Sequence, residues 1–439
     1  MIKRFSIVCS PLLPHRTAIV LCAGFLLSTA AWGKSAKIYP HSPCHPKNRW
    51  PGCAKKFHGT QLKPYTPKQF KDHGVEDKLT PLGRTARGFW ITPYYMHRVG
   101  AEKIAKMMKR NHLNAVVLDT KDDLGRVLWP SKVALSQQVQ NHLLPDPKQM
   151  LATFHNNGIY VIARMVTFKD SRLPYVRPDL SARIGPRARR LLSAGANWLD
   201  PYAMEVQDYI IELTLELEEL GFDEIQFDYI RFPKGLVSRI GTWLHNTDNT
   251  NRATLIRGFL ERVDRALRIP ISVDVYGLTT LVDGDPRQLG QSIEGMAKHV
   301  DAISPMMYAN GMDTYFKNNK VTEHVYNLIN CGLWRARKKA PNIALRPYLQ
   351  AYPNNVEHFF GVDFIARQLD AAERAGSDGF LFWNPGMRNG VVWGGLKRFR
   401  HTRVDTFGQN TSQWKENEPG QWCKRKGAVF TKKRKKDGK

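Results

Sequence analysis

Three aspartates lie at the ends of short apolar runs, where carboxylates could do chemistry. Asp119 ends the run NAVVLDT, and two others, Asp228 and Asp274, lie in EIQFDYI and PISVDVY. Side chains of a strand alternate between its two faces, so Asp228 shares a face with Gln226 and Asp274 shares one with Ser272. The bulky apolar residues of both runs take the opposite face. We therefore expect the carboxylates to point inward, toward a common pocket.

Paired carboxylates across a pocket are the groups that glycoside hydrolysis requires. One protonates the leaving oxygen as general acid, and the other acts as nucleophile or base. We expect Asp228 to be the nucleophile or base, Asp274 the general acid, and Asp119 a supporting carboxylate. Other chemistries lack their motifs, since the His-Glu-x-x-His pattern of metalloproteases and the Gly-x-Ser-x-Gly elbow of serine hydrolases are absent. We expect no metal and no cofactor.

The elements that must position these groups alternate along the chain from Arg87 onward. Short β-rich runs are separated by helical patterns over 101–111, 204–220, 252–267 and 364–375, which predicts a parallel sheet covered by helices. Eight strands close a (β/α)8 TIM barrel. A doubly wound open sheet is the alternative, but its glycine-rich nucleotide fingerprint is missing. The expected strands are 88–92, 114–120, 159–166, 224–230, 270–276, 302–308, 343–349 and 379–383.

Polar and aromatic residues near these strand ends complete the candidate site, because the carboxyl ends of barrel strands converge on one pocket. Aromatic rings there can stack on sugar faces, although any single ring could equally belong to the core. Basic residues would orient the carboxylates or contact substrate. The expected substrate-binding residues are Lys121, Arg164, Tyr229, Arg231, Tyr276, Tyr308, Arg346 and Trp383.

Several runs resemble the bacterial glycoside-hydrolase domain family, and the resemblance extends from Arg87 to Phe399. It implies a (β/α)8 barrel distantly akin to α-amylase-like glycosidases, with Asp228 as nucleophile or base. The α-amylase-like enzymes usually have a glutamate acid on strand five, where this chain has Asp274. The matching runs are GFDEIQFDYIRFP (221–233), RGFWIT, NAVVLDTKDDLGRV (114–127), NWLDPYAMEVQDY (197–209), ISPMMY (303–308) and GFLFWNPG (379–386).

The composition is that of a globular protein with a large excess of positive charge. The 439 residues carry a formal net charge of +27, and 10% are aromatic. With a mean hydropathy of −0.42, this excludes disorder throughout and a multi-span membrane protein. The last 17 residues alone hold nine basic residues against one acidic. A basic tail suits salt-dependent adhesion to anionic envelope polymers, and nucleic acid is not expected because no matching fold motif accompanies the charge.

The first 33 residues are typical of an export signal. A basic start precedes an apolar run over 17–32, shorter than the ~20 residues of a spanning helix, although an uncleaved anchor is the alternative. We expect a periplasmic or extracellular protein with no stable membrane span. Export favours disulfides among Cys44, Cys53, Cys331 and Cys423. The expected division is signal peptide 1–33, basic extended arm 34–86, barrel 87–400 and basic tail 401–439.

A long insertion follows the third strand. Residues 167–197 carry seven basic residues against two acidic, and loops after barrel strands lie on the active-site face. If Arg172, Arg177 and the arginines over 183–190 overhang the pocket, the substrate is anionic. The leading hypothesis is thus an exported glycoside hydrolase of a polysaccharide, anionic in this interpretation. The alternative is a non-catalytic, glycan-binding envelope protein, which carboxylates closed off by Arg or Lys would favour.

Overall fold

A computed structural model describes residues 64–184, 189–190, 197–234, 241–283, 285, 288–310, 321–353 and 360–408. They belong to one unit, Gly52–Lys439. The predicted signal peptide, most of the arm and most of the tail lie outside these residues, as do Cys44, Cys53 and Cys423. Within the described ranges, no helix combines the length and apolar character needed to cross a membrane.

The described strands form the predicted barrel. All neighbouring strands of the main sheet are parallel, in the order β10-β9-β11-β12-β1-β2-β3-β6-β8, and pairing of β8 with β9 closes it. The short strands β10 and β11 together occupy the seventh of eight positions, which confirms the (β/α)8 fold. The bounds are β1 Arg87–Ile91, β2 Ala115–Lys121, β3 Tyr160–Val166, β6 Glu224–Asp228, β8 Ile271–Tyr276, β9 Ala302–Met306, β10 Ala344–Leu345, β11 Tyr348–Gln350 and β12 Phe380–Trp383.

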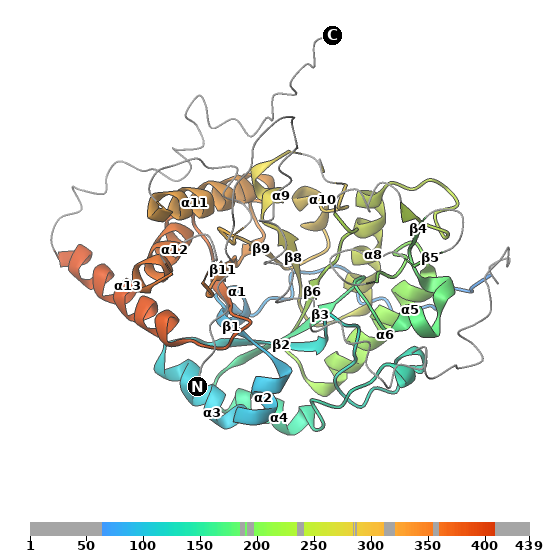
Figure 1. Cartoon of the computed structure of the whole chain (residues 1–439), viewed down its shortest axis with the longest axis horizontal. Coiled ribbons are helices and arrows are strands. Elements are labelled where there is room, and N and C mark those ends of the chain that lie inside the picture. Colours follow the sequence, from blue (N-terminus) through green and yellow to red (C-terminus); the bar gives the residue numbers. More distant parts are fainter. Residues whose placement is uncertain are drawn as a thin grey trace, which may run out of the picture. The chain divides into compact units, whose positions relative to one another are not determined.

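Helices surround the strands (Figure 1). The four helices expected from the sequence are present, and α6 has the expected bounds. Gly221 follows the last residue of this helix, and its φ of 100° is the left-handed conformation common after helices. The bounds are α1 Pro81–Arg84, α2 Pro93–Val99, α3 Ala101–Arg110, α4 Pro147–Asn156, α5 Leu173–Val176, α6 Met204–Leu220, α8 Arg252–Ala266, α9 Leu278–Leu281, α10 Ile293–Met296, α11 Val321–Lys339, α12 Val362–Arg374 and α13 Gly390–Gly408, with 3-10 turns at Ala134–Gln138 and Pro178–Leu180.

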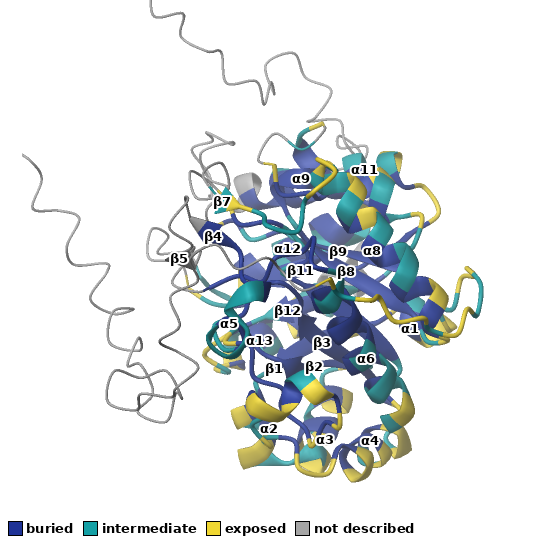
Figure 2. Cartoon of the chain, turned by 90° about the vertical axis from the view of Figure 1, so that its right-hand side faces the viewer, coloured by how far each residue is buried: buried dark blue, intermediate teal, exposed yellow. Residues whose placement is uncertain are grey.

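Two apolar layers hold the barrel together, and the strands between them are buried along their length (Figure 2). One layer lies between strands and helices. The other fills the barrel and includes Trp90, Val117, Ile162 and Leu381. Because strand residues alternate between these layers, the polar side chains of the inner face gather above and below the inner apolar cluster. The upper polar group, at the carboxyl ends of the strands, forms the candidate site.

Segments outside the barrel strands pack against it. From residue 64 the predicted arm follows α6 and α8: the Lys68 amide donates to Asp208, and Lys78 Nζ lies 2.8 Å from Asp264. The insertion contributes β4 (Arg183–Ile184) and β5 (Arg189–Arg190), which form a small antiparallel sheet with β7 (Gly241–Thr242). Helix α13 continues beyond the predicted barrel end at residue 400, as far as Gly408.

Candidate active site

Asp228 and Asp274 lie side by side at the carboxyl ends of the neighbouring strands β6 and β8. The register pairs Gln226 with Ser272 and Phe227 with Val273, so one step further along the strands places the two aspartates at the same level. Paired strands are about 4.8 Å apart. Both aspartates line a pocket of about 250 Å³ at this end of the barrel. The predicted convergence of these two carboxylates is thus what the structure shows.

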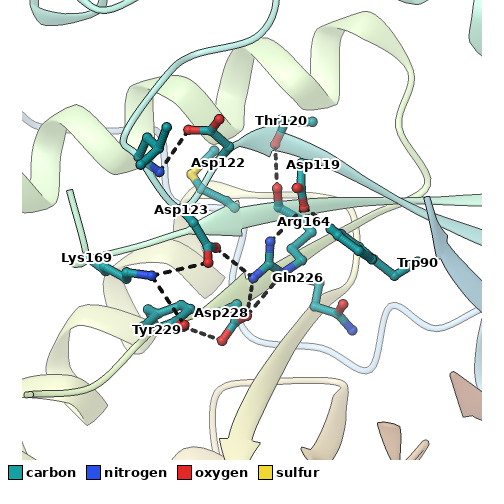
Figure 3. A network of polar contacts seen from close by, with 12 residues as sticks. Trp90, Asp119, Thr120, Asp122, Asp123, Arg164, Lys169, Gln226, Asp228 and Tyr229 are labelled. Atoms are coloured by element: carbon teal, nitrogen blue, oxygen red, sulfur yellow. Dashed lines mark hydrogen bonds and ion pairs between the residues drawn. The ribbon is translucent and has the colours of Figure 1, made fainter. Parts of the chain in front are cut away.

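The Asp228 carboxylate is held on both oxygens. Its Oδ2 accepts hydrogen bonds from Arg164, with Nε at 3.1 Å and Nη2 also in contact. Its Oδ1 accepts from the backbone N–H of Tyr229 at 2.6 Å, and Figure 3 shows Asp228 between these two donors. Tyr229 has a φ of 50°, a left-handed conformation that an L-residue seldom adopts. Hydrogen bonds from a guanidinium and from a backbone amide fix the orientation of the carboxylate.

Asp274 lies in the opposite electrostatic environment. Its side chain is almost fully buried, and its Oδ1 has no hydrogen-bond partner among the described residues. Burial, and next the nearby charge of Asp228, raise the pKa of Asp274 well above its usual value, while Arg164 and Arg346 only partly oppose this. A raised pKa favours the protonated form of a carboxyl group. Two neighbouring groups of the same chemical type therefore lie in different electrostatic environments.

Arg164, on β3, connects the carboxylates of the site. Besides Asp228 it contacts Asp119, with Nη1 2.7 Å from Oδ1, and Asp123, with Nη2 3.2 Å from Oδ1 (Figure 3). Asp119 also accepts from the Trp90 indole N–H at 2.8 Å, and burial raises its pKa to about 6 despite Arg164. One guanidinium thus serves three carboxylates.

Sequence reasoning missed Asp123 as a site residue. It follows β2 and lines the pocket, where its side chain is 42% exposed. Its other oxygen accepts from Lys169 Nζ at 3.2 Å, and although burial opposes ionisation, Arg164 and Lys169 hold the pKa of Asp123 below its usual value. The signal was present, because the run DTKDD continues past a strand end within a family-like motif.

Aromatic rings form much of the pocket wall. Tyr229, Tyr276, Tyr308, Tyr348 and Trp383 all line it. Two further rings support this wall: Trp90 stacks on Trp383 at a centroid distance of 3.8 Å, and Tyr352 meets Tyr308 edge-on. Flat rings beside hydrogen-bonding carboxylates suit a sugar, which has both apolar faces and hydroxyl edges. In the part of the chain that the structure describes, no cluster of three or more His, Cys, Asp or Glu side chains could hold a metal ion.

Comparison with known families matches residues 88–389 to the family described as "Putative glycosyl hydrolase domain". The match covers more than half of the chain. The chain belongs to this family. The domain is therefore a glycosyl hydrolase domain, as the resemblance of its motifs implied, and its (β/α)8 barrel is the scaffold on which the carboxylates are arranged.

Two solved structures agree with the fold of this glycosyl hydrolase domain, and a third is similar in sequence over part of the chain. The PgaB (BpsB) glycoside hydrolase domain from Bordetella bronchiseptica is 14% identical, with a TM-score of 0.53 over 72% of this chain and 98% of that one. α-L-Fucosidase isoenzyme 2 from Paenibacillus thiaminolyticus is 11% identical, with a TM-score of 0.50 over 73% and 49%. A hypothetical protein from Ruminiclostridium thermocellum is 30% identical, with a TM-score of 0.39 over 43% and 97%. No curated protein matches the chain.

The glycosyl hydrolase domain places most of the predicted site residues around its pocket. Asp119, expected as a supporting carboxylate, lies behind Arg164 and does not line the pocket. It contacts Arg164, which in turn contacts Asp228. The predicted residues that line the pocket are Arg164, Asp228, Tyr229, Arg231, Asp274, Tyr276, Tyr308 and Trp383.

Lys121, expected to orient the carboxylates or contact substrate, does not line the pocket in the structure. The pairing of β2 with β3 shifts register between Asp119 and Lys121, so strict alternation fails at the end of the strand. Lys121 is fully buried, with its Nζ 2.8 Å from Asp170 and 2.9 Å from the carbonyl oxygen of Val166. A single irregularity in the ladder has moved this side chain out of the site.

The prediction that Arg346 lines the pocket is also wrong. Arg346 lies between β10 and β11 and is fully buried at the amino end of the barrel. Its Nη1 and Nη2 donate to Glu224, the first residue of β6, and Nη1 also reaches the carbonyl oxygen of Gly83 in α1. The side chain belongs to the inner face as expected, but it points to the end opposite the pocket.

Among the described residues, the insertion contributes no charged side chain to the lining of the pocket. Arg177 is bound to Asp179 and Glu205, Arg183 donates to the Pro178 carbonyl oxygen, and neither they nor Arg172 line the pocket. Arg187 lies outside the described residues, as do the side chains of Arg189 and Arg190. The cations that do line the pocket are Arg164, Arg231 and Lys234.

Proposed function

We propose that the protein is an exported glycoside hydrolase that cleaves a polysaccharide, with Asp228 as nucleophile or base and Asp274 as general acid. The observation that carries this proposal is the contrast between the two carboxyl groups. Asp228 accepts hydrogen bonds from Arg164, whereas Asp274 is buried without a partner on Oδ1 among the described residues and has a raised pKa. Neighbouring carboxyls whose environments separate their protonation states are the pattern of acid–base pairs in glycosidases.

In this mechanism the Asp274 carboxyl donates its proton to the glycosidic oxygen as the bond to the anomeric carbon breaks. Positive charge develops on the sugar, and the Asp228 carboxylate stabilises it or bonds to the anomeric carbon. Water completes hydrolysis, losing a proton to the Asp274 carboxylate, which restores the acid. Arg164 keeps Asp228 oriented throughout, because its other contacts with Asp119 and Asp123 fix the guanidinium.

Asp228 and Asp274 lie at the same level on the paired strands β6 and β8, which favours retention of anomeric configuration. Strands about 4.8 Å apart bring the two carboxyl groups closer to the ~5–5.5 Å of retaining enzymes than to the ~6.5–9.5 Å of inverting ones. A closely spaced pair leaves no room for a water between the base and the sugar. Asp228 then acts as nucleophile, and NMR of the first-formed anomer distinguishes this from its acting as base.

Export and a surface location complete the proposal. Cys331, buried in α11, is disulfide-bonded, and disulfides are typical of oxidising compartments. Cleavage of the signal before Lys34 would be seen by mass spectrometry of protein recovered from the periplasm or medium. We further propose that the basic arm and tail bind anionic envelope polymers, which predicts release by salt.

The test is hydrolysis of a polysaccharide panel by the wild-type chain, Asp228→Asn and Asp363→Asn. Asp363 is exposed on α12, away from the pocket, so its substitution controls for loss of an aspartate. We expect Asp228→Asn to lose about 10⁴-fold or more of the activity, with an unchanged thermal transition, and Asp363→Asn to match wild type. Cleavage by Asp228→Asn at the wild-type rate would contradict the assignment. Tight binding of a glycan without cleavage by wild type would instead support the binding-protein alternative, which the contact of Arg164 with Asp228 favours.

A further inference from the structure

Arg231 differs from two other cations near the pocket, Arg164 and Lys169, in its partners. Arg164 and Lys169 are each within ion-pair distance of a carboxylate. Arg231 lines the pocket, yet no carboxylate of the described residues forms an ion pair with it. Its only hydrogen bond in this part of the chain runs from Nη1 to the carbonyl oxygen of Phe232, at 3.0 Å. The Nε and Nη2 edge of its guanidinium is therefore left without a protein acceptor there.

Aromatic rings fix the guanidinium of Arg231 in place. Its Cζ lies 5.2 Å from the Trp198 ring centroid and 5.0 Å from that of Tyr229. Burial lowers the pKa of Arg231, and the nearby groups Tyr229, Asp228 and Asp123 only partly oppose this. A cation–π contact compensates for only part of this cost. The arrangement is a preorganised cation with no ion-pair partner among the described residues.

A cation without an ion-pair partner beside the reaction centre opposes glycosidic cleavage of a neutral sugar. The sugar becomes positively charged as the bond breaks, so a nearby guanidinium raises the barrier unless an anion of the substrate lies between them. Nε and Nη2 form the flat two-donor edge that matches the two oxygens of a carboxylate or a sulfate group. The need for an anion and the geometry of the donors agree.

We propose that Arg231 is the recognition residue for an oxyanion substituent of the substrate, so that the enzyme acts on an acidic sugar, one bearing a carboxylate or a sulfate ester. This rests on the proposed function and names its substrate class. The charge that selects the substrate then comes from the loop after β6, where Arg231 follows Asp228 by three positions, rather than from the insertion.

The test compares matched pairs of sugars as probes of the full chain carrying Asp228→Asn, so that binding is measured without hydrolysis. Each acid is paired with its neutral parent: glucuronate with glucose, galacturonate with galactose, and mannuronate with mannose. The 6-sulfates of glucose and galactose distinguish a sulfate from a carboxylate. We expect at least one charged probe to bind about 10- to 100-fold more tightly than its parent. Adding Arg231→Gln should abolish that preference.

A matched control is Arg177→Gln in the same background, because Arg177 lies in the insertion and does not line the pocket. It should leave the preference unchanged. The proposal is overturned if no charged probe outbinds its parent, or if the preference survives Arg231→Gln. Failure of the proposed function gives a different result, since wild type would then cleave no glycan whatever its charge preference in binding.

Discussion

The two ends of the barrel interior are built from the same kinds of side chains, but their charges are arranged differently. At the amino end, Glu224 meets a single cation: its Oε1 and Oε2 accept from Arg346 at 2.5 and 2.9 Å. The hydroxyls of Ser272 and Tyr160 also donate to this carboxylate. One acid is matched by one base, and both are fully buried.

At the carboxyl end, carboxyl groups outnumber the cations that contact them. Arg164 is shared by Asp119, Asp123 and Asp228, and Asp274 has no ion-pair partner among the described residues. A balanced pair holds the strands together and leaves nothing to react. In the proposed mechanism, the excess of carboxyls leaves Asp274 protonated and able to donate that proton, so that one end of the barrel supports structure and the other chemistry.

The largest effect on stability is expected from removing the Glu224 charge at the amino end of the barrel. Glu224→Gln leaves the Arg346 charge buried and unpaired, which should lower the free energy of unfolding by about 3–5 kcal/mol. Adding Arg346→Met should recover part of this loss, because no buried charge then remains. Chemical denaturation of the single and double variants measures both. If Glu224→Gln is as stable as wild type, the ion pair at the amino end does not have the structural role that distinguishes this end from the carboxyl end.

At the carboxyl end, Asp274→Asn should instead remove activity and spare the fold. Loss of the general acid should reduce kcat by about 10²- to 10⁴-fold. The amide resembles the protonated acid that the folded protein already holds, so we expect no loss of thermal stability at neutral pH. Steady-state kinetics and a melting curve test this together. A melting temperature that falls with the activity would mean that Asp274 is structural.

The two ends should also differ in their pH dependence. The folded protein keeps a proton on Asp274 that the unfolded chain, with a pKa of 3.8 there, releases. The free energy of unfolding should therefore fall as pH rises from that value toward the raised pKa of the folded state. Asp274→Asn should flatten this decline. Activity should persist through neutral pH and be lost once Asp274 ionises. If the free energy of unfolding of Asp274→Asn declines with pH as steeply as that of wild type, other groups cause the decline.

The smallest effect is expected from the outer contacts of the carboxyl end. Trp90→Phe removes the indole N–H that donates to Asp119, which should cost about 0.5–1.5 kcal/mol of stability. Because Arg164 still holds Asp119, kcat should change by less than about tenfold. Leu381→Ile, in the same apolar cluster, is the packing control. A loss of activity as large as that of Asp274→Asn would place Asp119 in the chemistry itself.

The sequence predicted the barrel because strand alternation and helical periodicity are local properties. The alternation also identified the inward faces that carry Asp228 and Asp274. Prediction from the sequence failed where the outcome depended on contacts between distant segments. The register shift after Asp119 turns Lys121 away, and only the pairing with β3 reveals it. Arg346 was correctly expected to face inward, but its height in the barrel depends on Glu224 across the interior. Asp123 lies past a strand end, where alternation no longer applies.

The left-handed backbone at Tyr229 has a consequence for anyone who would move this site to another barrel. The conformation costs about 1–2 kcal/mol relative to an ordinary one, yet it lets one short segment supply the Asp228 carboxylate, an amide that binds it and the Tyr229 ring. These parts cannot be grafted one side chain at a time. A designer would have to transplant residues 228–231 as a single backbone unit and supply Arg164 from the neighbouring strand.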